Sequence, residues 1–252
     1  MRLLLILLLL LQANSLKANE INYLLNIPHL EIYKLNNTNG LKYLSAKKNF
    51  KIGINNNITC DKTSKENLNK NFPIINKNLE IYKSEFLKKI NLRFIVLCEN
   101  LFISKINTAG IPDHEKRTLI LDLNFNKKYF ERVIHHEVFH MIHDSFKNIF
   151  DEEIWSSLNN KEFQYAECST CSDRLGLDLY DKTNGFLTEY SKSIPSEDMA
   201  EIYSFLITNG INIKNKSKKD LILFNKIKFV ETRINKIKNF KIDDKKSNSI
   251  TL

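Results

Sequence analysis

The pattern of hydrophobic and polar residues predicts three strands and a helical region in the first half of the chain. Alternation over residues 50–54 predicts a short strand, and apolar runs predict two more strands at 92–97 and 117–123. Between the first two strands, apolar residues recur at steps of three and four over residues 65–90. This spacing predicts helix, with a start that is offset by Pro73. Loops are expected at 55–65 and 107–114.

The second half of the chain is predicted to be largely helical. Residues 151–188 show weak periodicity and many polar side chains, which we interpret as an ordered insert. Pro195 and Ser196 then open a helix that runs to Ile207, with Ser196 as its N-cap. A stripe of apolar residues predicts a last helix at 219–240. These elements indicate an α+β fold, with a small mixed sheet followed by a helical C-terminal part.

Between the strands and the insert, an apolar run at 129–146 contains the motif H-E-x-x-H. Its two histidines, His136 and His140, lie one above the other on a helix, about 6 Å apart, so both can bind one metal ion. The run predicts a buried helix, and buried histidines need partners such as a metal. Glu137 is rotated about 100° around the helix, where it can reach a water held on the metal. The motif therefore predicts a zinc site, with Glu137 as the candidate general base.

A catalytic zinc site uses three protein ligands and keeps one position open. One known pattern places a glycine three residues and a third histidine six residues after the second histidine, but those positions hold His143 and Phe146. We interpret His143 as a histidine that flanks the site. A carboxylate from a downstream helix is the other solution. Glu197 and Glu201 offer two such carboxylates, one turn apart on the same helix face.

The start of the chain predicts export. An unbroken apolar run at 3–11 follows one positive charge at Arg2, and small residues at Ala13, Ser15 and Ala18 offer cleavage points. Such a run is too short to span a bilayer and is typical of a secretory signal peptide. We therefore expect residues 1–18 to be a signal segment and the protein to be secreted or periplasmic. An uncleaved anchor is the alternative.

The rest of the chain has a length suited to one compact domain. We expect this domain at 46–240, including the insert at 151–188. An extended lead-in is expected at 19–45, and a flexible tail at 241–252. We expect the protein to be a monomer.

The formal net charge of +9 could indicate a nucleic-acid partner. The lysines, however, are spread among asparagine and isoleucine, with no arginine cluster and no interleaved aromatic residues. We therefore expect no nucleic-acid partner, and no membrane span once the signal segment is removed.

Four cysteines in an exported chain predict disulfide bonds. Three pairings are possible, and we favour Cys168 with Cys171 and Cys60 with Cys98, because Cys98 ends a strand that could lie beside the one ending near Cys60. A four-cysteine zinc site is disfavoured, since a second C-x-x-C pair is absent from the sequence.

Several blocks of the sequence, taken together, resemble known metallopeptidases. The H-E-x-x-H motif followed by Tyr190-x6-Glu197-x3-Glu201 resembles the gluzincin metallopeptidases of the lethal-factor type. A closer similarity is to the family of putative zinc-binding metallopeptidases, which has W-x-x-L-N, G-F-V-T-x-Y and E-D-F-A-E blocks. The similar stretches here are 155–165, 185–190 and 196–201. The resemblance covers residues 117–207 and departs from the family at 160–162, where a Pro-Gly turn would be expected.

The resemblance implies a zincin-like catalytic domain and a zinc endopeptidase acting on peptide or protein substrates. It implies one Zn²⁺ held by His136, His140 and Glu197. Glu201 would then accept a hydrogen bond from a ligand histidine, and Tyr190 would donate to the oxyanion of the reaction. The reverse assignment of Glu197 and Glu201 stays open. In this fold the strand at 117–123 would form the sheet edge above the zinc, where an extended substrate can pair.

Two other functions are compatible with the same fold. An exported binding or adhesion module could use zinc as a structural ion, but such a site has no need of Glu137. A zinc hydrolase acting on cell-wall peptides would keep every site residue and differ only in substrate.

Overall fold

The computed structural model describes residues 27, 29–34, 37–238 and 240. The expected signal segment at 1–18 and the expected tail at 241–252 lie outside these residues, as does much of the lead-in at 19–45. Within the described part of the chain, each helix is too short or too polar to cross a membrane.

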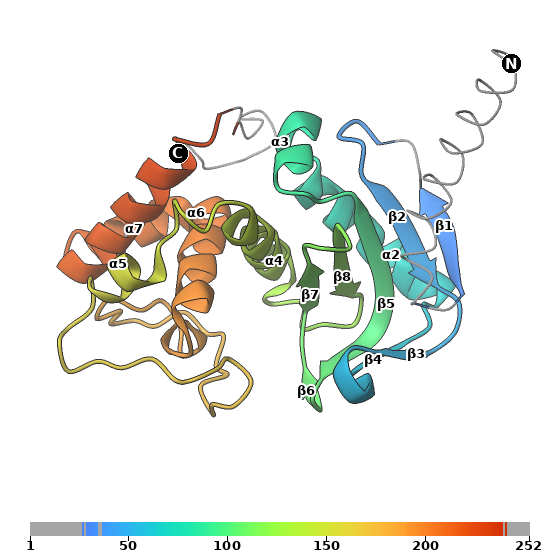
Figure 1. Cartoon of the computed structure of the whole chain (residues 1–252), viewed down its shortest axis with the longest axis horizontal. Coiled ribbons are helices and arrows are strands. Elements are labelled where there is room, and N and C mark those ends of the chain that lie inside the picture. The colour runs from blue at the N-terminus through green and yellow to red at the C-terminus, as the bar shows by residue number, and fades with distance from the viewer. Residues whose placement is uncertain (1–26, 28, 35–36, 239, 241–252) are drawn as a thin grey trace, which may run out of the picture.

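Five strands form a mixed sheet in the N-terminal half of the molecule (Figure 1). The central three strands run parallel to one another, and an antiparallel strand pairs with each side. In spatial order the strands are β1 (Leu30–Lys34), β2 (Lys42–Ala46), β5 (Phe94–Ile103), β8 (Thr118–Asp122) and β7 (Gly110–Asp113). The expected domain begins at residue 46, but the sheet also includes β1 and β2, which begin before that position.

The long strand β5 continues past this sheet into a second, antiparallel set of strands. These strands are β3 (Phe50–Ile52), β4 (Ile58–Asp61) and β6 (Ile106–Asn107), with a 3-10 turn, η1, at Ile54–Asn56. Asn100 has a positive φ of 54° at the point where β5 changes partners. Asparagine tolerates this left-handed conformation better than most residues, because its short polar side chain can form local hydrogen bonds.

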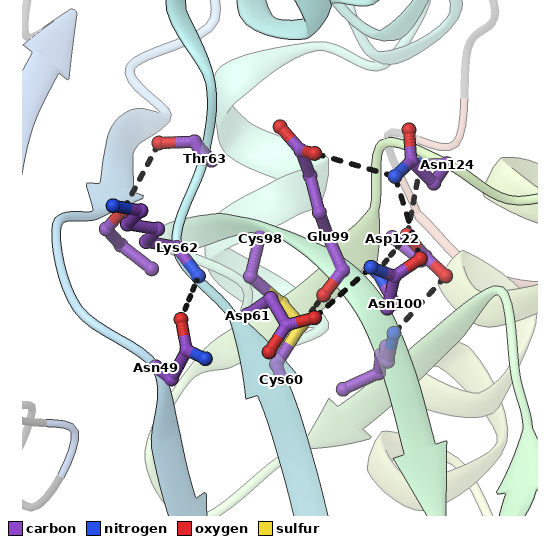
Figure 2. The surroundings of a disulfide bond; sticks show 12 residues. Asn49, Cys60, Asp61, Lys62, Thr63, Cys98, Glu99, Asn100, Asp122 and Asn124 are labelled. Atoms are coloured by element: carbon purple, nitrogen blue, oxygen red, sulfur yellow. Dashed lines mark hydrogen bonds between the residues drawn. A yellow bond between two sulfur atoms is a disulfide. The ribbon is translucent and has the colours of Figure 1, made fainter.

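The change of partners in β5 is fixed by a disulfide and by hydrogen bonds around it (Figure 2). Cys60 of β4 is joined to Cys98 of β5. Beside this bond, the Asp122 carboxylate accepts from the backbone N–H of Asn100 at 2.9 Å and of Leu101 at 3.1 Å. A second disulfide joins Cys168 to Cys171. Both bonds follow the pairing favoured from the sequence.

Helices cover one face of the sheet and extend beyond β7 (Figure 1). They are α2 (Lys65–Leu79), α3 (Ser84–Lys89), α4 (Phe130–Ser145), α5 (Glu152–Ser156), α6 (Pro195–Ser217) and α7 (Leu221–Ile234). Side-chain caps fix three of their starts: Ser64 accepts from Asn67 N–H, Asp151 from the N–H groups of Glu153 and Ile154, and Asp220 from Leu223 N–H. Helix α4 lies between the sheet and the C-terminal helices, so it is packed on most of its sides.

Alternating residues of the parallel strands belong to two hydrophobic clusters, one on each face of the sheet. Ile95 and Leu97 of β5 pack with the helices, whereas Phe94 and Val96 belong to a smaller cluster on the opposite face. This alternation follows from the two-residue period of a strand. The expected α+β fold, with a small mixed sheet, a buried motif helix and a helical C-terminal part, is confirmed.

The expected sheet edge is wrong. The strand predicted at 117–123 is β8, which pairs with β5 on one side and with β7 on the other. Strand β7 comes from the segment 107–114 that the sequence predicted to be a loop, and β8 is its only strand partner in the described chain. Gly110 and Pro112 made this segment look like a loop, but proline is tolerated in an edge strand because one side of the strand needs no donor.

Two helix starts also differ from expectation. Helix α2 begins at Lys65 and carries Pro73 inside it, so the proline does not offset the start. The N-cap of α6 is Ile194, not Ser196, because Pro195 occupies the first helical position, which its fixed φ favours. Helix α6 also runs beyond the expected end at Ile207, with a non-helical residue at Asn209.

Candidate metal centre

Helix α4 brings the two histidines of the H-E-x-x-H motif together. Residues 136 and 140 lie on one face, and the Nε2 atoms of His136 and His140 are 3.2 Å apart. His136 is buried, while His140 is slightly more open. The rings lie nearly edge to face, with their centroids 4.9 Å apart. Both imidazoles therefore present the same kind of nitrogen to one point in space.

Glu197, from the first turn of α6, meets both histidines at that point. Its Oε2 lies 2.8 Å from His136 Nε2 and 3.1 Å from His140 Nε2. The three candidate ligand atoms all lie within 4.8 Å of one another. Two imidazole nitrogens and one carboxylate oxygen form a donor set that suits a catalytic zinc ion, since a fourth position is left for water.

The charge on Glu197 is favoured by its surroundings. Burial alone would raise its pKa, but the nearby His140 and the hydrogen bond with His136 outweigh burial and hold the pKa below its usual range. Glu197 also lies in the first turn of α6, where the helix dipole favours a negative charge. The group is thus an ionised carboxylate at neutral pH, as a metal ligand must be.

Glu201 lies one turn further along α6, behind the histidines. Its Oε1 is 2.9 Å from Nδ1 of His136, and its Oε2 accepts from the Thr188 hydroxyl at 2.8 Å. Arg132, one turn before His136 on α4, forms a buried salt bridge with Glu201. Although burial opposes it, Arg132 is the main cause of a lowered pKa at Glu201. Glu201 therefore contacts the far side of the His136 ring, away from the point where Glu197 meets it.

Glu137 lies on the side of α4 that faces strand β7. Burial raises its pKa above the usual value, although the neighbouring His136 and His140 oppose the shift. The backbone of Gly110 in β7 passes so close that a Cβ there would lie 2.6 Å from Glu137 Cγ. Only glycine leaves room for this side chain at this position.

Tyr190 lies across the site from β7, in the short 3-10 helix η2 (Tyr190–Lys192). Its ring centroid is 5.8 Å from that of His136. Burial, followed by the charges of Glu197 and Glu137, raises its pKa well above 10. The phenol therefore keeps its proton at neutral pH and can donate a hydrogen bond.

These groups line one cleft of about 750 Å³. One wall is formed by the segment 106–112, which includes β7, and the floor is formed by α4. The opposite wall comes from Leu175, Leu177, Tyr190 and the first turns of α6. Ser169 and Thr170, between the paired Cys168 and Cys171, also line the cleft. An extended chain laid in this cleft would run beside β7 and over the histidine pair.

The two remaining histidines of α4 lie outside the ligand cluster. His135 is buried in the core between the Tyr82 hydroxyl at 2.7 Å and Asn78 Oδ1 at 2.9 Å, and burial lowers its pKa to about 3. His143 lies 3.2 Å from the carbonyl oxygen of Phe150 and lines the cleft. This position agrees with the interpretation of His143 as a flanking residue.

Sequence reasoning missed several residues that support the site. Arg132 lies four residues before His136, so helical spacing could have indicated it. Thr188 lies inside one of the family-like blocks, and Gly110 was seen only as a loop residue. Lys226, buried beneath α6, is one of 38 lysines and arginines and has no distinguishing pattern around it.

Comparison with known proteins finds similarity to a family described as zinc-binding. The family model described as putative zinc-binding metallo-peptidase matches residues 63–245. The search of curated proteins finds no match. Among solved structures, a putative zinc-binding metallo-peptidase from Bacteroides caccae is similar, with 17% identity, 87% of this chain and 85% of that chain covered, and a TM-score of 0.48. Because the family model spans most of the sequence, the chain belongs to the family of putative zinc-binding metallopeptidases.

Proposed function

We propose that this zinc-binding metallopeptidase is an exported endopeptidase of the gluzincin type, with one zinc ion held by His136, His140 and Glu197. The observation that carries the proposal is the position of Glu197 Oε2, 2.8 Å and 3.1 Å from the Nε2 atoms of the two histidines. A zinc ion in such a set lowers the pKa of a bound water toward neutrality and polarises a peptide carbonyl.

Glu137 is the general base of the proposed reaction. It takes the proton of the attacking water and passes it to the nitrogen of the leaving amine. Burial raises the pKa of Glu137, which makes its carboxylate a stronger base for taking the proton of the water. The close backbone of Gly110 limits where the carboxylate can turn.

Tyr190 is the proposed donor to the oxygen of the scissile carbonyl as negative charge builds on it. Its raised pKa keeps the hydroxyl protonated, and its ring lies beside His136 on the wall opposite β7. A donor of this kind stabilises the transition state by about 3 kcal/mol in other hydrolases.

The substrate is proposed to be an extended peptide that pairs with the free side of β7. This strand has its other side hydrogen-bonded to β8 and lines the cleft beside Glu137. Backbone pairing of this kind supplies affinity without a strong demand on side chains. Export is supported by the two disulfides, which persist in oxidising compartments.

The proposal is tested by incubating the purified protein with a mixture of peptides of varied sequence and identifying new chain ends by mass spectrometry. Cleavage is expected with wild type, should stop with a zinc chelator, and should return when zinc is added. Glu137→Gln, which keeps the shape of the side chain and removes its basicity, is the matched control and should leave the peptides intact. Cleavage of purified cell wall but of no peptide would favour the cell-wall hydrolase instead. Zinc-loaded wild type that cleaves neither material would contradict the enzymatic proposal.

A further inference from the structure

The turn of α6 that carries Glu197 has no side-chain cap. The N-cap residue is Ile194, whose side chain cannot accept a hydrogen bond, and Pro195 follows it at the first helical position. The turn is closed by the backbone alone, through Asp198 N–H to the Ile194 carbonyl oxygen at 3.1 Å. Helix ends without a cap fray more readily, so this turn needs another support to hold a ligand in place.

Asp198, the residue after Glu197, supplies this support through its side chain. Its side chain is fully buried, and its Oδ2 accepts three hydrogen bonds. The donors are Tyr165 OH at 2.6 Å, Lys226 Nζ at 2.6 Å and Trp155 Nε1 at 3.0 Å. Trp155 lies on α5 and Tyr165 follows it in the insert at 151–188, whereas Lys226 lies on α7, so one carboxylate joins the insert and α7 to the first turn of α6.

Lys226 is itself fixed from several sides. Its side chain is fully buried, its Nζ donates to the Gly185 carbonyl oxygen at 2.9 Å, and the same atom lies 3.7 Å from the centre of the Phe186 ring. A buried charge pair of this kind adds little net stability compared with an apolar pair of the same size. Its contribution to geometry is the stronger reason for its presence here, because it holds Asp198 in one place.

We propose that Asp198 is a positioning residue for the metal centre. By binding Trp155, Tyr165 and Lys226, it fixes the turn in which Glu197 meets the two histidines. The inference rests on the proposed function, since it takes Glu197 to be a zinc ligand. It also gives a shared role to two separate stretches of the family resemblance, because Trp155 and Tyr165 of the stretch 155–165 both donate to Oδ2 of Asp198 in the stretch 196–201.

The test is the dissociation constant for zinc, measured by competition with a coloured chelator on the purified protein. Asp198→Asn removes the charge that accepts the hydrogen bonds of Trp155, Tyr165 and Lys226. Lys226→Met removes the charged donor on α7. Each is expected to raise the Kd by about 10-fold to 100-fold, the range found when residues that orient metal ligands are changed. Circular dichroism of each metal-free variant checks that it is folded at the assay temperature.

Tyr165→Phe is the most conservative variant, because it removes only the hydroxyl that donates to Asp198 and leaves the ring in place. It is expected to raise the Kd by a smaller factor, and it keeps the test decisive if the two charge variants do not fold. Asp220→Asn is the matched control: Asp220 accepts from the Thr183 hydroxyl at 2.5 Å, from Gly185 N–H at 2.6 Å and from Leu223 N–H at 3.0 Å. These bonds support the same loop and helix as Lys226 and none of them reaches the first turn of α6, so the Kd of Asp220→Asn should match wild type.

Two results would overturn the positioning role. One is a Kd for zinc equal to that of wild type in Tyr165→Phe and in whichever of Asp198→Asn and Lys226→Met folds. The other is an equal rise of the Kd in Asp220→Asn, which would mean that loosening this region in general weakens the site. Wild type that fails to bind zinc would instead contradict the proposed function, so the two failures are distinguishable.

Discussion

Glu201 lies 2.9 Å from Nδ1 of His136, on the side of the imidazole opposite to the nitrogen that faces Glu197. A carboxylate in this position fixes which ring nitrogen carries the proton and which one is free to bind a metal. The salt bridge from Arg132 and the hydrogen bond from Thr188 keep the carboxylate ionised and directed at the ring. The two glutamates of α6 therefore have different surroundings, which supports Glu197 as the ligand and Glu201 as the residue that orients His136.

Glu201→Gln is expected to weaken zinc binding without abolishing it. The variant keeps the shape of the side chain but loses the charge that pairs with Arg132, so the Kd for zinc should rise by about 10-fold to 100-fold. Chelator competition measures this change. Glu153→Gln, at an exposed carboxylate that also lines the cleft, is the control and should bind zinc like wild type. Complete loss of zinc in Glu201→Gln would point to the reverse assignment of the two glutamates.

Gly110→Ala is expected to impair catalysis while zinc stays bound. The new methyl group would lie 2.6 Å from Glu137 Cγ and 3.1 Å from the Ile120 carbonyl oxygen, so either Glu137 or strand β7 must shift. A misplacement of about 1 Å in a reacting group can lower kcat by about 100-fold. Normal kcat in Gly110→Ala would show that the close approach of β7 to Glu137 has no role in the reaction.

Tyr190→Phe is expected to lower kcat by about 100-fold, with little change in KM and with zinc retained. The expected pattern follows from a hydroxyl that donates only as negative charge develops on the substrate. Steady-state kinetics on a cleaved peptide separates the two constants. Tyr180→Phe, outside the cleft lining, should behave like wild type. A rise in KM with unchanged kcat would mean that Tyr190 binds the substrate without assisting the reaction.

Stability should depend on pH through Glu99, beside the Cys60–Cys98 disulfide. Burial would raise the pKa of Glu99, but hydrogen bonds from Ser64 N–H, Asn67 and Asn124 lower it below 4.5. A depressed pKa contributes stability above the ordinary value, and this contribution is lost as pH falls through the depressed pKa. The advantage of wild type over Glu99→Gln in unfolding free energy should therefore be constant above about pH 5 and shrink below pH 4.5. Denaturant unfolding of both proteins across this range measures the difference, and an advantage that stays constant to pH 3 would contradict this account.

The sequence was most informative where function and local pattern coincide. The motif helix was expected at 129–146 and is Phe130–Ser145, because an apolar run with regular spacing defines a buried helix well. The spacing from Tyr190 to Glu197 and Glu201 indicated which acids to examine. In the structure Glu197 meets the histidines, whereas Glu201 contacts the rear of His136.

The sequence was least informative where tertiary contacts override local preference. Strand β7 contains glycine and proline, so it looked like a loop until its pairing with β8 was known. Strands β1 and β2 fall in the segment expected to be an extended lead-in. Strand β2 pairs with β5, far along the chain, and such long-range pairing leaves no local signal. The uncapped start of α6 and the buried pair of Asp198 and Lys226 likewise depend on residues that meet only in the folded chain.

The most direct test of the metal centre is the zinc content of the purified protein, measured by elemental analysis for wild type, Glu197→Ala and Glu137→Ala. This account predicts about one zinc per chain in wild type, loss of zinc in Glu197→Ala and retention in Glu137→Ala. Wild type without zinc after metal is supplied, or Glu197→Ala that binds zinc as wild type does, would contradict it.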